Sequence, residues 1–253
     1  MDEQEMSFWD HLDVLRSVIL RMIVVTIVVA VAAFCLKTQL FDIVLAPTRN
    51  SFPTYRLVDA PPFTLRLVNI GLTEQFVIHV KTAIVAGVIG ASPYILYQLY
   101  RFISPALYER ERRHATQVVA AGYVMFIVGL VVNYLLIFPL TLRFLSTYSI
   151  STAVGNMLTL ESYMDTLLSM SLTFGIVFEI PVISWLLALC GLLRSEWMRN
   201  YRKHAFIAVL VVAAIITPTG DAFTLAIVSL PIWLLYESSI WIVRQVERGK
   251  VRT

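Results

Sequence analysis

Long apolar runs dominate the chain, and short segments that hold most of the charged residues separate them. A transmembrane helix needs about 20 apolar residues, so each run is a candidate membrane span. Six spans are predicted, at residues 17–36, 76–100, 116–138, 163–193, 205–217 and 222–243. At about 1.5 Å per residue the fifth reaches only about 20 Å, which is short for a bilayer core of about 30 Å. The pattern therefore predicts an all-α polytopic membrane protein with six transmembrane helices.

The segments outside the spans also carry structural signals. Residues 37–75 form the longest loop, which contains four prolines and little Gly or Ser, the residues of flexible linkers. We expect this loop to form an ordered cap on the outer face. Residues 7–16 have apolar positions at helical spacing and are expected to form a short interfacial helix before the first span. Residues 1–253 are expected to form a single integral membrane domain.

Composition supports the membrane assignment and excludes other classes. Hydrophobic residues make up 58% of the chain, and Asp, Glu, Lys and Arg together only 15%, whereas about 25% of residues are charged in soluble domains. Such a chain lacks the polar surface of a soluble enzyme and the basic face of a nucleic-acid-binding module. The sequence contains no His and Cys spacing typical of a metal site, and it indicates no cofactor.

The distribution of the charges predicts the orientation of the chain. Arginine and lysine cluster in the loops after the second and fourth spans and in the C-terminal tail. The loops after the third and fifth spans are poor in both. Because cytoplasmic loops carry an excess of Lys and Arg, both termini are predicted to lie in the cytoplasm.

Glu179 is the residue that most strongly suggests a function. It lies near the middle of the fourth span, where a charged side chain costs about 2.5–3.5 kcal/mol, and Pro181 is expected to kink the helix two residues later. Intramembrane acids are usually functional, which favours a polar site that faces a concavity or a partner helix. The alternative is a protonated, hydrogen-bonded glutamate that only joins helices.

Other candidate residues lie at the ends of the spans. The loop at 102–113 mixes acids and bases beside aromatic residues, and its carboxylates suit a partner's arginine. An ordinary solvated loop is the alternative, and composition alone favours it. Asp13 and Arg16 share a helix face, so pairing with each other is at least as good an interpretation as recognition. Asp221 is placed to cap the sixth span, and Pro93 is more typical of a kink than of a binding site.

Five short motifs follow one another along the chain. They are HLDVLR at 11–16, PYILYQ at 93–98, FISPALY at 102–108 with ERR at 111–113, FGIVFEIP at 174–181, and TP at 217–218 with Asp221 and Phe223. In this order and topology they resemble the TatC family, the multi-spanning subunit of the twin-arginine protein translocase. The resemblance covers nearly the whole chain.

The resemblance implies a fold of six helices, the last two short, that form a curved, cup-like wall in a bacterial inner membrane with both termini in the cytoplasm. It implies transport and no enzymatic activity. The family exports folded proteins that bear twin-arginine signal peptides, driven by the proton-motive force. The implied partners are these signal peptides, single-span TatA- and TatB-type subunits, further copies of the chain and the lipid bilayer.

The resemblance also implies roles for individual residues. Those implied to bind the signal peptide are Glu111, Phe102, Asp13, Leu12 and Arg16. Glu179 corresponds to the intramembrane acid that lines the cupped face and contacts partner helices. Those implied to have structural or outer-face roles are Pro47, Pro93 and Asp221.

Two positions depart from the family pattern. The acid that often precedes Leu-Arg in the N-terminal motif is replaced by Val14, and Asp13 stands one residue earlier, about 100° away around a helix. The resemblance leaves open whether Asp13 takes the place of that acid. If it does not, Glu111 contributes more to binding of the twin-arginine motif. Leu225 occupies a position where the sixth span of family members often has a polar Gln. The resemblance therefore does not support a polar contact with a partner subunit at this position.

Two other functional classes fit the sequence less well. A small-solute secondary transporter needs several polar groups near the midplane and usually broken half-helices, whereas Glu179 is nearly alone at depth. An intramembrane enzyme needs a Ser–His pair, an Asp pair or an HExxH motif within its spans, and the sequence has none.

Overall fold

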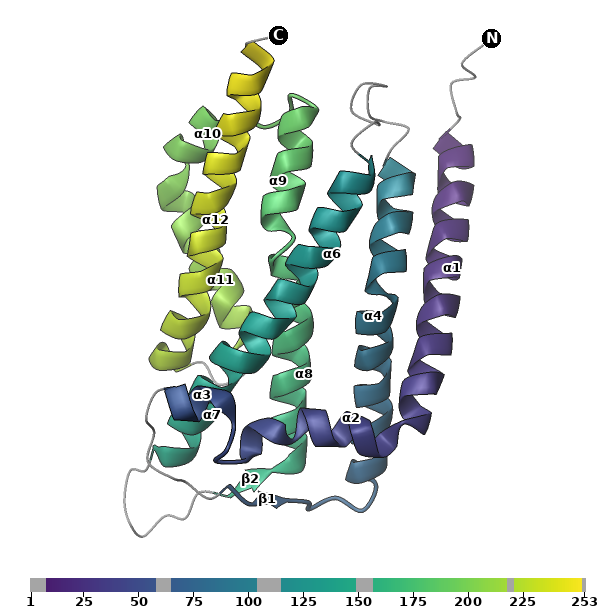
Figure 1. Ribbon diagram of the computed structural model, residues 1–253, viewed down its shortest axis with the longest axis vertical. Helices are drawn as coiled ribbons and strands as arrows, with labels where there is room; N and C mark the ends of the chain where they lie inside the picture. Colours follow the sequence, from purple (N-terminus) through teal and green to yellow (C-terminus); the bar gives the residue numbers. More distant parts are fainter. Residues whose placement is uncertain (1–7, 58–64, 104–114, 149–156, 218–220, 252–253) are drawn as a thin grey trace.

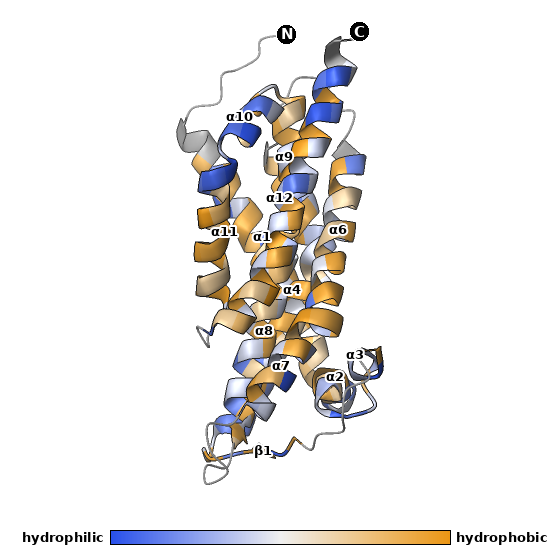
Figure 2. Ribbon diagram, turned by 90° about the vertical axis from the view of Figure 1, so that its left-hand side faces the viewer, coloured by the Kyte–Doolittle hydropathy of each residue, from blue (hydrophilic) through white to orange (hydrophobic). Residues whose placement is uncertain are grey.

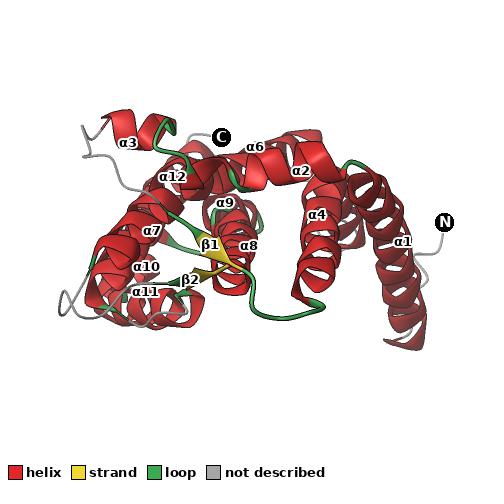
Figure 3. Cartoon of the chain, turned by 90° about the horizontal axis from the view of Figure 1, so that it is seen from below, coloured by secondary structure: helices red, strands yellow, loops and turns green. Residues whose placement is uncertain are grey.

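Long helices run side by side along the molecule and give it the form of a bent wall (Figure 1). The computed structural model describes residues 8–57, 65–103, 115–148, 157–217 and 221–251. Viewed along the helices, α1 (Phe8–Cys35) and α4 (Glu74–Ile103) stand at one end of a curved row, and α12 (Ala222–Val251) stands towards the other (Figure 3). The expected all-α, cup-like architecture is confirmed.

Five helical stretches of the described residues are long and apolar enough to cross a membrane. They are Leu12–Cys35, Glu74–Phe102, Thr116–Thr147, Leu160–Leu189 and Ala222–Gly249. These stretches correspond to the predicted spans one, two, three, four and six. The predicted fifth span is α11 (Arg202–Ile216), whose 15 residues extend about 22 Å at about 1.5 Å per residue. As predicted, α11 is short for a bilayer core.

Some helix boundaries differ from the predicted ones, because charged residues alone do not end a helix. α1 is continuous from Phe8 and has no separate interfacial segment, since it contains neither Gly nor Pro. α12 runs for 30 residues, past the predicted end at 243, so of the last two helices only α11 is short. The third span continues beyond 138, through the π-helix η3 (Asn133–Ile137) into α7 (Phe138–Thr147).

The fourth span is divided into α8 (Leu160–Val177) and α9 (Ile180–Leu189), at the kink that Pro181 predicts. α6 (Ala115–Val132) runs obliquely across α8, and the short α10 (Ser195–Asn200) lies near the end of the molecule where α12 finishes (Figure 1). Hydrophobic residues cover the middle of the wall, and polar residues gather at its two ends (Figure 2). This banding is what a bilayer requires of the surface that faces it.

The segment between α1 and α4 is ordered in its described part, as predicted for the outer cap. It consists of α2 (Lys37–Val44), the 3-10 turn η1 (Ala46–Thr48), α3 (Pro53–Leu57) and β1 (Leu67–Val68). β1 pairs in parallel with β2 (Leu158–Thr159), which directly precedes α8. The cap therefore joins the N-terminal half of the chain to the start of the fourth span.

Tyrosine hydroxyls fasten this cap. Tyr134 donates to the carbonyl of Ile43 at 2.6 Å, and Tyr163 donates to the carbonyl of Val44 at 2.8 Å. Within the cap, Tyr55 donates to the carbonyl of Pro47 at 2.9 Å. Burial raises the pKa of the Tyr55 hydroxyl above its ordinary range, so the hydroxyl keeps its proton and remains a donor.

α1 packs along α4 through very close backbone contact. A Cβ atom on Gly87 of α4 would lie 2.6 Å from the Cβ of Ala30 and 2.8 Å from the carbonyl oxygen of Thr26. Both neighbours belong to the α1 helix itself and cannot rotate away. The glycine therefore sets the distance between the two helices.

We predict that Gly87→Ala destabilises the protein and displaces α1. Overpacking costs about 1–3 kcal/mol, which exceeds the gain of about 1 kcal/mol that alanine usually brings to a helix. Thermal unfolding of the purified protein in detergent measures the effect as a lowered midpoint. Gly249→Ala in α12 is the matched control, because its Cβ would meet nothing within 4 Å. Equal midpoints for the two variants would contradict the close-contact argument.

We also predict that Tyr55→Phe weakens the cap by about 1–3 kcal/mol, because a buried carbonyl loses its donor. The unfolded chain releases the tyrosine proton near pH 10, whereas the folded chain holds it to higher pH. Stability therefore falls as pH rises through this range, and the variant lacks this part of the decline. Unfolding midpoints from pH 8 to pH 11 test both effects, with Tyr97→Phe, at an exposed position of α4, as the control.

Candidate functional site

A cleft opens between α4 and the α8–α9 pair, with α6 as its floor. Its volume is about 500 Å³, and its walls are almost entirely apolar. The residues that line it are Val88, Ser92, Ile95, Leu96, Leu99, Tyr100, Val118, Val119, Gly122, Phe126, Leu172, Ile176, Glu179, Val182, Ile183 and Leu186. Glu179 is the only carboxylate among these residues, so the predicted functional acid lies in the wall of a concavity.

The break between α8 and α9 places Glu179 in this wall. Pro181 has no backbone N–H, so the span loses one backbone hydrogen bond at this point. The Glu179 N–H instead donates to the Ile176 carbonyl at 3.0 Å, and the Glu179 carbonyl accepts from Ile183 at 2.9 Å. Both backbone groups of Glu179 are thus satisfied at the break, and Glu179 occupies the N-cap position of α9.

The Glu179 side chain lies against α6. It is 9% exposed, and a Cβ atom on Gly122 would lie 3.0 Å from its Oε2 atom. The Oε1 atom is buried and has no hydrogen-bond partner among the described residues. No described cation pairs with the carboxylate either. A polar group that is buried without a partner costs free energy, so this acid is suited to a ligand, a partner helix or a proton.

Contacts between aromatic rings and glycines fix this part of the wall. A Cβ atom on Gly129 of α6 would lie 2.5 Å from the carbonyl oxygen of Phe174, and one on Gly175 of α8 would lie 2.6 Å from the Phe126 ring. The two helices therefore interlock one and two turns from Gly122. Glu179 is held against α6 by backbone geometry and not by a polar bond of its side chain.

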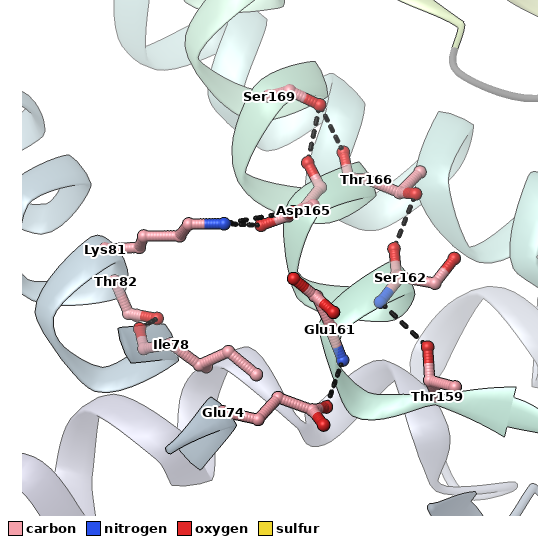
Figure 4. A network of polar contacts seen from close by, with 10 residues as sticks. All are labelled: Glu74, Ile78, Lys81, Thr82, Thr159, Glu161, Ser162, Asp165, Thr166 and Ser169. Carbon is pink, nitrogen blue, oxygen red and sulfur yellow. Dashed lines mark hydrogen bonds and ion pairs between the residues drawn. The ribbon is translucent and has the colours of Figure 1, made fainter. Parts of the chain in front are cut away.

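A polar network joins α4 and α8 at the end of the cleft nearest the cap (Figure 4). Lys81 donates to both carboxylate oxygens of Asp165, at 2.9 and 3.1 Å. Glu74 accepts from the N–H of Glu161 at 3.0 Å and from the N–H of Gly71 at 2.8 Å. These bonds tie together two helices that diverge towards the cleft.

Sequence reasoning missed this network. In the sequence Lys81 and Asp165 are single charges near the starts of the second and fourth spans, and neither indicates a site. The two residues have opposite charges and lie near the starts of their spans, but only the fold shows that α4 and α8 are neighbours there. A second missed ion pair joins Arg202 of α11 to Glu237 of α12 at 2.6 Å.

The residues predicted to bind a signal peptide lie at the opposite end of the molecule from the cap. Leu12, Asp13 and Arg16 lie in the first turns of α1 and are exposed, and Phe102 is half-buried in the last turn of α4. These two helix ends lie at the same end of the wall (Figure 1). Asp13 and Arg16 form no ion pair with each other. Glu111 lies outside the described residues.

The three residues expected to have structural or outer-face roles lie in different places. Pro47 is buried in η1 and supplies the carbonyl that binds Tyr55. Pro93 lies within α4, and Asp221 caps α12 as predicted, accepting from the N–H of Thr224 at 2.7 Å. Leu225, the apolar substitution in the family pattern, packs against the core.

The chain is similar to known proteins over almost its whole length. Residues 10–231 match the family model described as Sec-independent protein translocase protein (TatC). The TatC protein of Blattabacterium sp. subsp. Periplaneta americana is 30% identical, covering 98% of this chain and 99% of the relative. That of Koribacter versatilis is 35% identical, covering 93% and 84%.

The fold also matches a solved structure. The crystal structure of a twin-arginine translocase receptor, TatC, superimposes with a TM-score of 0.79 at 30% identity, covering 94% of this chain and 99% of that chain. The solved chain and this one therefore share the arrangement of helices described above. The sequence matches and the shared fold lead to one conclusion: the chain belongs to the TatC family of Sec-independent protein translocase proteins.

Proposed function

We propose that this chain is the receptor and core subunit of a translocase that exports folded proteins bearing twin-arginine signal peptides, driven by the proton-motive force. The observation that carries the proposal is the unpartnered Glu179 carboxylate in an apolar cleft, within a chain of the TatC family. A membrane protein retains such an acid when a ligand or a partner uses it.

The proposed setting is a bacterial inner membrane, with residues 1–253 as one membrane domain and both termini in the cytoplasm. Two observations support this orientation. The first turns of α1 and the last turns of α12 lie at the same end of the wall (Figure 1). α4 ends and α6 begins at that end, and α10 of the loop after the fourth span lies there as well (Figure 1). The sequence is basic after both of these spans, and basic loops favour the cytoplasmic side.

Signal-peptide recognition is proposed at this cytoplasmic end. Glu111 supplies the carboxylate for a guanidinium fork, which binds a carboxylate through two parallel hydrogen bonds. Phe102 in the last turn of α4 is proposed to contribute to the same site, and the exposed turn of α1 with Leu12, Asp13 and Arg16 adds a second surface. Asp13 has no ion pair with Arg16, so its carboxylate is available to a partner's cation.

Glu179 has a separate proposed role deeper in the membrane. The cleft around it is apolar over about 500 Å³, so it fits an apolar helical segment. A polar group on that segment would satisfy the Oε1 atom of Glu179. The proposed occupants are the membrane helices of TatA- and TatB-type subunits, and self-association of the chain completes the complex.

We predict that Glu111→Gln reduces crosslinking of a twin-arginine precursor by about ten-fold or more, the effect of losing a charged hydrogen bond. The precursor carries a photoreactive residue beside its paired arginines, and membranes containing the full complex are irradiated. Glu109→Gln, an acid of the same loop, is the matched control. Crosslinking that persists in Glu111→Gln, or is lost equally in both variants, would exclude Glu111 as the specific arginine partner.

We predict that Glu179→Gln leaves precursor crosslinking at the loop intact but lowers transport by about ten-fold or more. The measurement is protease protection of a precursor transported into membrane vesicles. Ser92→Ala is the control, because the Ser92 hydroxyl lines the same cleft but already donates to the Ile89 carbonyl at 2.7 Å.

Gly122→Ala gives an independent test of the same carboxylate. The added methyl group would lie 3.0 Å from Oε2 of Glu179, so the acid must shift. Transport is expected to fall in this variant although no polar group has been removed. Full transport by both Glu179→Gln and Gly122→Ala would remove the support for an intramembrane role of Glu179.

A further inference from the structure

A second groove lies on the other side of the contact between α6 and α9. Its volume is about 400 Å³, which is within the range of about 300–1,000 Å³ of small-molecule sites. The residues that line it are Ala121, Met125, Pro181, Val182, Trp185, Trp241, Ile242, Gln245 and Val246, from α6, α9 and α12. Val182 borders both this groove and the Glu179 cleft, but the groove contains no acid.

The charges of α12 are distributed unequally around this groove. Trp241, Arg244, Gln245 and Arg248 are exposed and follow one another at the spacing of a single helix face. Two of them, Trp241 and Gln245, line the groove itself. This face of α12 therefore carries two exposed arginines on the turns next to Gln245, although neither arginine lines the groove itself.

The acids of α12 are occupied elsewhere. Glu237 pairs with Arg202 at 2.6 Å, and Glu247 accepts hydrogen bonds from the N–H and the hydroxyl of Ser195. No described carboxylate pairs with Arg244 or Arg248. These two arginines are four residues apart, and like charges at this spacing destabilise a helix. An anion bound between them would relieve the repulsion.

The groove is almost entirely apolar, and it lies beside the part of α12 where the surface changes from apolar to polar. Towards its C-terminal end α12 changes from hydrophobic to hydrophilic residues (Figure 2). Trp185 and Trp241 line the groove near this boundary. Tryptophan is enriched where a bilayer meets water, because one part of its ring system is apolar and the other carries a hydrogen-bond donor.

We propose that this groove binds one anionic phospholipid. An acyl chain lies in the apolar channel between Trp185 and Trp241, and the phosphate group is held by Arg244 and Arg248. Basic pockets between transmembrane helices recognise anionic headgroups through the same chemistry. The site faces away from the Glu179 cleft, so a lipid bound there occupies neither that cleft nor the turns of α1 and α4 proposed to receive a signal peptide.

The full chain, reconstituted in phosphatidylcholine vesicles, tests the proposal by quenching of tryptophan fluorescence. Brominated phosphatidylglycerol is compared with brominated phosphatidylcholine at equal mole fractions. We expect stronger quenching by the anionic lipid, and the double Trp185→Phe, Trp241→Phe variant removes most of the difference. Arg244→Gln and Arg248→Gln each lower the preference for phosphatidylglycerol by about five-fold.

Two controls keep the test specific. Arg199→Gln removes an exposed arginine of α10 at the same end of the molecule and is expected to leave the preference unchanged. Arg244→Lys keeps the positive charge, so this variant is expected to retain most of the preference for phosphatidylglycerol. Equal quenching by the two lipids in the unaltered chain would overturn the proposal, and so would a preference that survives the double Arg244→Gln, Arg248→Gln variant. A partner helix that crosslinks to Trp185 and abolishes quenching would identify the groove as a protein-binding face instead.

Discussion

A bilayer core offers no hydrogen-bonding partners to a backbone, and this constraint is hardest to meet where a span is broken. The break between α8 and α9 meets it by bonding the Glu179 N–H to the Ile176 carbonyl and the Ile183 N–H to the Glu179 carbonyl. Because the backbone is satisfied in this way, it needs nothing from the glutamate side chain. The carboxylate remains in the cleft as a polar group whose partner must come from elsewhere.

The same constraint explains how the cap is attached. Tyr134 and Tyr163 are rooted in the spans, and their hydroxyls bind carbonyls at the end of α2. Tyrosine suits this position because its ring tolerates an apolar environment while its hydroxyl needs a polar partner. At the π-helix η3 the carbonyl of Leu135 accepts a hydrogen bond from the hydroxyl of Thr54 in α3. A cap held by such bonds also positions β1 beside β2, directly before α8, the helix that leads to Glu179.

The spans, the short α11, the kink at Pro181 and the cap on α12 by Asp221 were predictable, because hydropathy and local backbone chemistry determine them. The π-helix at Asn133 was not, since it has no local sequence signal; the continuity of α1 could have been inferred from its lack of Gly and Pro. The Lys81–Asp165 ion pair depends on which helices become neighbours, and these residues are 84 positions apart. At the candidate site, the sequence identified Glu179 as an intramembrane acid. Only the structure shows that Gly122 makes room for it and that α4 forms the opposite wall of its cleft.

The wall therefore has two faces with different electrostatic character, and α9 separates them. On one face Glu179 lies in an apolar cleft without a described cation. On the other face Arg244 and Arg248, on the turns of α12 next to the groove residue Gln245, pair with no described carboxylate. The acids that could have neutralised these arginines locally are instead used to hold α10 and α11 against α12, at Ser195 and Arg202. Since polar groups are costly within a membrane, the distribution favours an acid reserved for a polar or cationic partner and arginines reserved for an anionic one.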